Sequence, residues 1–419
     1  MIKYKDYTGK EISLFVSCFL MMFTLVIRDQ FITPFILLYF LASLFFMKGE
    51  KLKATRTLAV VLISFYALHI ISLSYSSNWA YAGADLMTKL SYLAFPLFIL
   101  FIRSGFDLIM KGIRWGLIIG SFISMTFSFI RAFVEEGGAL SGVAYNTNLY
   151  GLNMHPSYLA LLFIIACAFL WQEKLNWRAS LLVKVGYTGL VVLSMFYLRS
   201  LGAFVCVAAI MCAFPVWQAL KKRNWKWLLI LPVYGVVFVL GLKSSAKIEN
   251  DVNTSLNRLK VWNKSSEQFL LDNKNNLESN TVRLVTWTLS SRLVKEHPFG
   301  VGIGDVKDEL EVSYRGYGYT YYAYNNLNPH NQFLQTGIAI GWIGIAILFV
   351  FLMLMLYYTF RANHLALFLA SLCIFVSCLF ESMLERQVGV ILTGILTMYI
   401  AFYIRSLGNA KLNVSENEE

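Results

Sequence analysis

Charged side chains are scarce in this chain of 419 residues, of which only 14% are Asp, Glu, Lys or Arg. A soluble protein carries roughly a quarter of its residues as charged side chains, because these cover its surface in water. Hydrophobic residues make up 58% of the sequence and aromatic residues 16%. This composition excludes a cytosolic enzyme and indicates a polytopic membrane protein, whose Trp and Tyr side chains suit the membrane interface.

Cysteine is also sparse, with six residues, all of them inside apolar runs. None is paired at the spacing of metal ligands, so neither a disulfide framework nor a zinc site is expected. No other motif calls for a metal or an organic cofactor. The net charge of +12 does not indicate a nucleic-acid partner, because most Lys and Arg residues lie in short clusters between apolar runs.

Apolar runs near the length of a transmembrane helix recur along the chain, and about twelve spans are expected. Helices are the only plausible spanning element, because an open strand edge in lipid leaves backbone groups unsatisfied. The predicted fold is an all-α polytopic membrane protein with one large, mostly helical external loop. The expected spans are 12–27, 31–47, 57–75, 86–102, 115–133, 157–171, 181–198, 203–220, 227–242, 333–358, 365–380 and 388–404.

The distribution of Lys and Arg predicts the orientation, because cytoplasmic segments are enriched in them. With the N-terminus in the cytoplasm, the short outer segments hold only Arg28, Arg131, Arg199 and Arg386. Both termini are then cytoplasmic, and the polar loop lies outside.

The chain is thereby divided into nine spans (1–242), a loop domain (243–329), and three spans with a cytoplasmic tail (330–419). Helices are expected in the loop at 255–270 and 281–295. A long external loop in a membrane protein usually carries function.

Two residues at the outer ends of spans are candidates for chemistry. Arg199 lies in a very short outer turn, where it is either a fixed cation for an anionic ligand or an interfacial Arg that reaches lipid phosphates. His330 follows Asn328 and Pro329, a pair that predicts the start of a helix. In a first turn the helix dipole disfavours an imidazolium, and a neutral imidazole can act as a general base. The alternative is a histidine that caps the helix or belongs to the interfacial belt.

His155 precedes Pro156 in the same pattern, and there a structural role is favoured. In the loop, Arg283 shares a helix face with Trp287, whereas Arg292 lies half a turn out of phase. Arg283 is therefore favoured as the inward-facing arginine.

Residues 300–305, Gly-Val-Gly-Ile-Gly-Asp, resemble a fragment of a nucleotide-binding loop but lack its strand–turn–helix context, so a simple glycine-rich turn is favoured. The tyrosines that follow, among them Tyr319, Tyr321 and Tyr322, suit either stacking on sugar rings or an interfacial aromatic belt.

Glu381 and Glu385 lie one helical turn apart at the outer end of a span and are followed by Arg386. Paired carboxylates at this spacing suit general acid–base catalysis. An ion pair with Arg386 or Arg199 is the alternative.

Together these motifs resemble the O-antigen ligase and O-antigen polymerase superfamily. The resemblance is carried by the large external loop before the tenth span and by Arg199 after the seventh. It is also carried by Arg283-x3-Trp287, by Pro-Phe-Gly-Val-Gly-Ile-Gly at 298–304, and by Pro-His-Asn-Gln at 329–332. It is strongest over residues 283–344. The family often has Ser-Arg-Gly at the first arginine, where this chain has Leu198-Arg199-Ser200.

The resemblance implies a metal-independent, inverting glycosyltransferase at the periplasmic face of the bacterial inner membrane. The donor is then a glycan on undecaprenyl pyrophosphate, and the acceptor in ligases is a sugar hydroxyl of lipid A-core. Arg199 and Arg283 match arginines thought to hold the pyrophosphate, and His330 matches the histidine thought to activate the acceptor. Glu381, Glu385, Arg386, His155 and Asn331 are supporting candidates, and Trp287, Tyr319, Tyr321 and Tyr322 are candidates for glycan contacts.

Two other functions remain open. An O-antigen polymerase extends the glycan on its carrier, and polymerases more often have two sizeable periplasmic loops. A lipid or solute transporter also fits about twelve spans, although paired broken helices and ionisable residues in mid-span are not visible in the sequence.

Overall fold

The computed structural model describes residues 7–47, 56–135, 154–175, 180–198, 200–243, 246–274 and 276–416, and its regular structure in these segments is entirely helical. The protein is therefore an all-α polytopic membrane protein, as predicted. The helices of the apolar regions are α1 (Gly9–Ile27), α2 (Ile32–Ser43), α3 (Arg56–Ser72), α4 (Trp79–Lys89), α5 (Ser91–Phe101), α6 (Phe106–Glu135), α7 (Pro156–Gln172), α8 (Ser180–Leu198), α9 (Leu201–Lys222), α10 (Ile230–Lys243), α16 (Gln332–Arg361), α17 (Leu365–Phe380) and α18 (Gln387–Glu416). Short 3₁₀ turns adjoin several of them: η1 (Asp29–Phe31), η2 (Leu44–Phe46), η3 (Leu73–Tyr75), η5 (Trp225–Leu229) and η6 (Met383–Glu385).

Each predicted apolar run is occupied by helix, but not every helix is long enough to cross a bilayer unaided. Among the described residues, 8 helical segments are long and apolar enough to span. Shorter apolar helices occupy Pro156–Gln172, Ser180–Met195, Trp225–Val236 and Leu365–Phe380. The count of twelve spans therefore stays a prediction.

The closest helix packing in the membrane region joins α1 to α6 through glycines spaced four apart. A Cβ on Gly116 would lie 2.4 Å from the Phe19 carbonyl oxygen, and one on Gly112 would lie 2.7 Å from the Phe15 carbonyl oxygen. Only glycine permits these helix backbones to approach so closely, which is how membrane helices gain packing energy without a hydrophobic effect between them.

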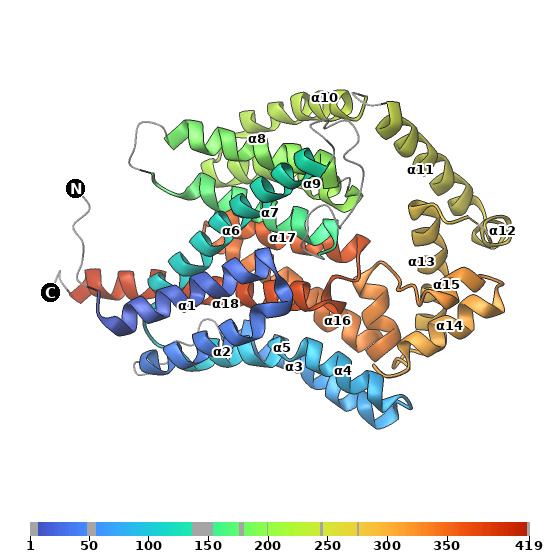
Figure 1. Ribbon diagram of the computed structural model, residues 1–419, viewed down its shortest axis with the longest axis horizontal. Coiled ribbons are helices and arrows are strands. Elements are labelled where there is room, and N and C mark those ends of the chain that lie inside the picture. The colour runs from blue at the N-terminus through green and yellow to red at the C-terminus, as the bar shows by residue number, and fades with distance from the viewer. Residues whose placement is uncertain are drawn as a thin grey trace.

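The external loop folds into helices α11 (Ala246–Lys264), α12 (Ser266–Asp272), α13 (Ser279–Glu296), α14 (Val306–Gly316) and α15 (Thr320–Tyr324). The expected helix at 255–270 is divided at Ser265, whose side chain caps α12 by accepting from the Gln268 backbone N–H. These loop helices gather at one end of the bundle, and α18 runs away from them towards the opposite end (Figure 1).

Helix α16 is interrupted at Ile340 and Gly341. The glycine-rich segment 298–304 forms hydrogen bonds with the backbone groups that the interruption leaves unpaired within the helix. Gly341 has φ 71°, and a Cβ there would meet the Pro298 carbonyl oxygen at 2.3 Å. The backbone N–H groups of Val301 and Gly302 donate to the carbonyls of Ile338 and Ala339 at 2.8 and 3.0 Å. Irregular backbone at membrane depth is tolerated where protein satisfies its polar groups in this way.

The same segment docks on the turn between α3 and α4, which confirms the turn interpretation. The backbone N–H of Gly304 donates to the Ser76 hydroxyl, and the Asp305 carboxylate accepts from the backbone N–H groups of Ser77 and Asn78 at 2.7 and 2.8 Å. Amides engaged in this way do not form a phosphate cradle. Instead, the absence of a Cβ at these glycines lets the segment approach α16 and the turn between α3 and α4 closely.

Candidate functional site

His330 lies in a strained turn just before α16, not in the first turn of the helix. Asn331 is the N-cap, and its side chain accepts from the Leu334 backbone N–H at 3.1 Å. His330 therefore precedes the cap and has φ 48°, a conformation that few non-glycine residues adopt. The prediction that Asn328 and Pro329 open the helix was wrong, because the capping bond forms three residues later. Strain of this kind is typical of functional sites.

Glu381, the C-cap of α17, pairs with this histidine. The His330 Nδ1 lies 3.2 Å from the Glu381 Oε1, and the two side chains are 24% and 14% exposed. Burial alone would raise the pKa of the Glu381 carboxyl. The hydrogen bond from His330 and nearby positive charges, Arg283 included, outweigh burial and hold that pKa below its usual value. An anionic carboxylate on Nδ1 orients the ring and leaves Nε2 as the proton acceptor.

Helix α13 positions the His330 turn and brings Arg283 beside it. The Thr286 hydroxyl donates to the Pro329 carbonyl, and the Trp287 indole N–H donates to the His330 carbonyl, both at 3.3 Å. Arg283, one turn earlier on this face, donates to Ser279 at 2.6 Å. The predicted common face of Arg283 and Trp287 thus lies against the histidine turn. Trp287 supports that turn through its indole.

Arg292 is directed elsewhere, as its phase on α13 predicted. It pairs with Glu267 at 2.5 Å and also contacts the Tyr317 hydroxyl.

A small pocket opens beside Arg283 and Glu381, where the N-termini of α7 and α9 meet. Ser157 and Gly202 line it from the first turns of these two helices. Ser200 caps α9, and its hydroxyl donates to the Ser157 hydroxyl at 3.1 Å, which holds the two ends together. Helix N-termini present free N–H groups and positive dipole ends, which favour anions.

Two further candidates, His155 and Arg199, lie near this pocket in the sequence, and the structure describes only His155. His155 is the N-cap of α7, and its side chain accepts from the Ser157 backbone N–H at 3.4 Å, so the structural role favoured for it is the one it has. Burial lowers its pKa. Arg199 lies outside the described residues, immediately before Ser200.

Deeper in the membrane region the same pocket becomes apolar. Leu161 and Ile164 from α7 and Cys206 from α9 line it there, together with the hydroxyl-bearing Ser377 from α17, whereas Phe380 lies next to Glu381. The pocket therefore joins a polar, anion-favouring mouth to a hydrocarbon-like interior.

A second, larger pocket lies next to the His330 turn, which contributes Asn328 to its lining. Polar and aromatic side chains line it, and the exposed Arg386 is among them. The amide oxygen of the buried Gln335 has no hydrogen-bond partner among the described residues. Further lining residues are Tyr81, Lys307, Glu311, Tyr314, Asn326, Asn328 and Glu385.

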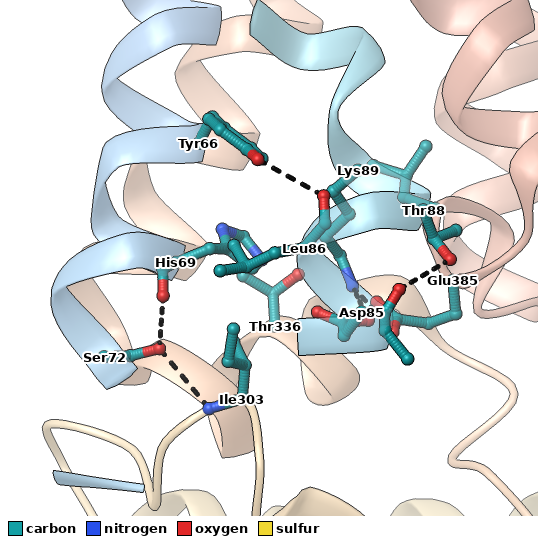
Figure 2. A network of polar contacts seen from close by, with 12 residues as sticks. Tyr66, His69, Ser72, Asp85, Leu86, Thr88, Lys89, Ile303, Thr336 and Glu385 are labelled. Atoms are coloured by element: carbon teal, nitrogen blue, oxygen red, sulfur yellow. Dashed lines mark hydrogen bonds and ion pairs between the residues drawn. The ribbon is translucent and has the colours of Figure 1, made fainter. Parts of the chain in front are cut away.

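Glu385 does not pair with Arg386 among the described contacts. Its Oε2 lies 2.9 Å from the ammonium of Lys89, a residue of α4 that is 2% exposed and that also contacts Asp85 (Figure 2). Burial opposes ionisation of Glu385, but the Lys89 ammonium outweighs it and holds the pKa of that carboxyl below its usual value. Glu385 is therefore the ion-pair partner of a buried lysine, its side chain is 16% exposed and lines the second pocket, and its role beside Glu381 stays a prediction.

Two of the tyrosine candidates belong to the core of the loop domain. Tyr319 and Tyr322 are 0% exposed, and their hydroxyls donate to the carbonyls of Leu270 and Asn276 at 2.7 and 3.0 Å. Neither offers a face to a sugar, because both rings pack inside the domain. Tyr321 is 50% exposed and stays a candidate for glycan contact.

No cluster of His, Cys, Asp or Glu suited to a metal ion occurs within the described segments. The positive charge around the first pocket comes from Arg283 and the helix N-termini.

Comparison with known families identifies the class of protein that these features belong to. Residues 186–349 match the family model described as O-antigen ligase. Over this region the match confirms the resemblance to the O-antigen ligase superfamily drawn from the motifs. The matched region covers Arg283 and His330 but ends before Glu381. A search of curated proteins found no match to the chain.

Sequence reasoning missed Lys89 and Asp85. They lie four residues apart on α4, in or next to the apolar run expected at 86–102. An acidic and a basic residue at this spacing in a membrane span is a detectable indication of a buried pair. Their partner Glu385 lies 296 residues further along the chain and was not predictable from spacing.

Proposed function

We propose that this protein is a glycosyltransferase of the O-antigen ligase type. It transfers a glycan from undecaprenyl pyrophosphate to a sugar hydroxyl of an acceptor such as lipid A-core. The observation that carries this proposal is the convergence at one pocket of Arg283, two helix N-termini and the His330–Glu381 pair.

The first pocket suits the diphosphate end of such a donor. The Arg283 guanidinium offers a planar fork to phosphate oxygens, and each charge-assisted bond contributes about 1.5–3 kcal/mol. The N-termini of α7 and α9 add N–H groups. Arg199, next to the α9 cap in sequence, is proposed as the second cation. The apolar residues deeper in the pocket suit the first isoprene units.

In the proposed reaction, the acceptor hydroxyl gives its proton to the Nε2 of His330 as its oxygen attacks the anomeric carbon. The new glycosidic C–O bond forms as the bond to the pyrophosphate breaks, and the pyrophosphate leaves with the electron pair. Attack opposite the leaving group inverts the anomeric configuration. Arg283 stabilises the charge that grows on the leaving group, which is where differential binding accelerates a reaction.

The acceptor is proposed to approach from the second pocket. Its amide, tyrosine and charged side chains can hydrogen-bond sugar hydroxyls and stack on sugar rings. Asn328 lines this pocket and lies two residues before His330, so a sugar held there is close to the proposed base. Tyr321 and Arg386 are further candidate contacts for a glycan.

We also propose that the site faces the periplasm of a bacterial inner membrane, with both termini in the cytoplasm. The distribution of Lys and Arg supports this orientation. The location of the loop helices at one end of the bundle is consistent with it (Figure 1).

Reconstitution distinguishes this function from the alternatives. Purified protein is mixed with a lipid-linked glycan and with lipid A-core, and the products are separated by electrophoresis and mass spectrometry. Glycan on lipid A-core supports the ligase, and a ladder on the carrier lipid indicates the polymerase. If no bond forms with any acceptor, glycosyl transfer is refuted and transport becomes the favoured function.

A further inference from the structure

A buried ionic cluster lies beside the proposed site but contacts neither of its catalytic groups. It consists of Lys89 and Asp85 on α4 and Glu385 on η6, with Lys89–Asp85 and Lys89–Glu385 distances of 2.5 and 2.9 Å (Figure 2). Lys89 is 2% exposed and Asp85 is 8% exposed. An ionisable cluster at such depth is costly to desolvate, so it is retained in a membrane protein where it has a function.

Gln332, the first residue of α16, connects this cluster to the His330 turn. Its amide nitrogen donates to the Glu385 carboxylate at 3.2 Å, and its amide oxygen accepts from the Leu384 backbone N–H at 2.6 Å. Gln332 is 1% exposed, so both bonds form away from water. The amide therefore clamps η6 to the start of α16.

Residues 328–332 and 379–385 are joined by a series of bonds that we call the clasp. The His330–Glu381 pair is one bond of the clasp and the Gln332–Glu385 pair is another. Between them, the Asn331 amide donates to the Leu379 carbonyl at 3.0 Å and the Ser382 hydroxyl donates to Asn328 at 3.3 Å. Because the same two segments carry these contacts and the Gln332–Leu384 bond, a shift at Gln332–Glu385 displaces His330 relative to Glu381.

Lys89 fixes one end of the clasp to α4. Leu86, Thr336 and His69 from α3 lie around the cluster (Figure 2). The Nδ1 of His69 contacts the Phe65 carbonyl at 2.8 Å, and Glu385 also lines the second pocket. If the ammonium is removed, two carboxylates lie together in a low-dielectric interior without a counter-charge. One carboxyl then takes up a proton or the two repel each other, and in either case Glu385 loses the ionic contact that holds it in place.

We propose that Lys89 is a positioning residue that holds His330 in register with Glu381 through Glu385 and Gln332. This inference rests on the proposed function only for its effect on transfer. The effect on the geometry of the clasp can be measured without any substrate.

The first test compares Lys89→Met, Lys89→Arg and a control, Arg292→Met. The control removes an ion pair in the loop domain whose Glu267 partner is 67% exposed and which has no bond to the clasp. With a lipid-linked glycan as donor, Lys89→Met is expected to lower kcat about 10²-fold, the usual consequence of a displacement near 1 Å, with the donor KM little changed. Lys89→Arg retains more activity than Lys89→Met because it keeps the charge, and Arg292→Met behaves like the wild type.

The second test measures His330 without turnover. The rate at which diethyl pyrocarbonate modifies His330 is followed by mass spectrometry on the full-length protein in detergent. In Lys89→Met this rate is expected to rise several-fold, because the ring no longer pairs with Glu381, and in Arg292→Met it is unchanged.

If Lys89→Met does not fold, Glu385→Gln tests whether Lys89 positions His330. It keeps the side-chain volume and the Lys89–Asp85 pair but removes the charge that joins Lys89 to the clasp. It is expected to lower kcat about tenfold and to speed modification of His330. Folded variants with the wild-type kcat and modification rate would overturn the proposal, as would an equal loss in Arg292→Met. If the wild type transfers no glycan, the proposed function fails, and the modification rates still decide whether Lys89 positions His330.

Discussion

Glu381 and Glu385 are both glutamates and lie four positions apart on one short connection between helices, yet they pair with different residues. Glu381 pairs with His330 at the edge of a pocket that also contains Arg283. Glu385 pairs with Lys89, accepts a hydrogen bond from Gln332 and lines the second pocket, with a side chain 16% exposed against 14% for Glu381. The two carboxylates therefore differ in their charged partners and not in their exposure.

This difference shows that partners, not spacing, assign the role of a carboxylate. A carboxylate next to an imidazole and an accessible pocket can orient a base. The same group next to a buried ammonium mainly fixes the backbone that carries it. Substitutions on the pocket side should therefore change activity by removing contacts to the substrate. Substitutions in the supports should lower stability or, at Lys89 and Glu385, change activity through the position of His330.

The largest effect is expected for Arg283→Ala on the pocket side. The loss of two charge-assisted bonds to the diphosphate predicts a roughly 10²–10⁴-fold decrease in kcat/KM. His330→Ala is expected to lose less, about 10²-fold, because general-base assistance is only one part of the rate enhancement. Both variants should remain monodisperse on gel filtration in detergent. Wild-type transfer by Arg283→Ala would remove the mechanism.

Arg199→Ala tests the second proposed cation in the same assay. The expected loss again exceeds that of His330→Ala, because a diphosphate carries enough charge for two guanidinium groups. Unchanged transfer by this variant would leave Arg283 and the helix N-termini as the whole diphosphate site.

Glu381→Gln tests the pocket side by its pH dependence. The folded-state pKa of Glu381 lies below the value of an unfolded Glu, about 4.3. Its ionic contribution to stability is therefore complete above about pH 5 and is lost as the pH falls through the folded pKa. The melting temperature of the wild type should decrease on acidification below about pH 5, and that of Glu381→Gln should decrease less. Parallel curves for the two proteins would contradict the pairing with His330.

Gly302→Ala probes the buried supports. The residue has φ 93°, and a Cβ there would lie 2.3 Å from the Ser76 hydroxyl oxygen. Strain of about 1–3 kcal/mol predicts a melting temperature several degrees lower, while the folded fraction keeps its transfer rate. Gly316→Ala is the matched control, because nothing lies within 4 Å of its added Cβ. Equal melting temperatures for the two variants would show that segment 298–304 does not need glycine there.

The smallest effects are expected for substitutions of the buried Tyr319 and the exposed Tyr321. Tyr319→Phe loses the bond to the Leu270 carbonyl and should lower stability by about 1 kcal/mol without altering transfer. Tyr321→Ala should leave the melting temperature unchanged and weaken acceptor binding, measured as a higher acceptor KM. An unaltered KM would exclude Tyr321 from the glycan site.

Local patterns in the sequence were sufficient for several features. The shortage of charge and the lengths of the apolar runs predicted the helical membrane fold. The four-residue spacing of Arg283 and Trp287 predicted their common face, and that face lies against the His330 turn. The cap of α16 was misplaced by three residues, because Asn328 and Asn331 are both good caps and only the bond to the Leu334 N–H chooses between them.

Long-range contacts were not predictable in the same way. Lys89 and Glu385 are 296 residues apart, and Tyr158 reaches the Met383 carbonyl across 225 residues. Neither pair leaves a local pattern, because spacing along a helix describes only neighbours on that helix.

The sequence by itself determined that the chain enters a membrane as helices and that the region with Arg283 and His330 resembles the O-antigen ligases. It did so because apolar length and helical periodicity are local properties. Only the tertiary structure decided which glutamate meets the histidine and which meets a lysine, and that glycines 300–304 join backbones rather than cradle phosphate. Those assignments depend on desolvation and on partners from distant helices, and these exist only once the helices have packed.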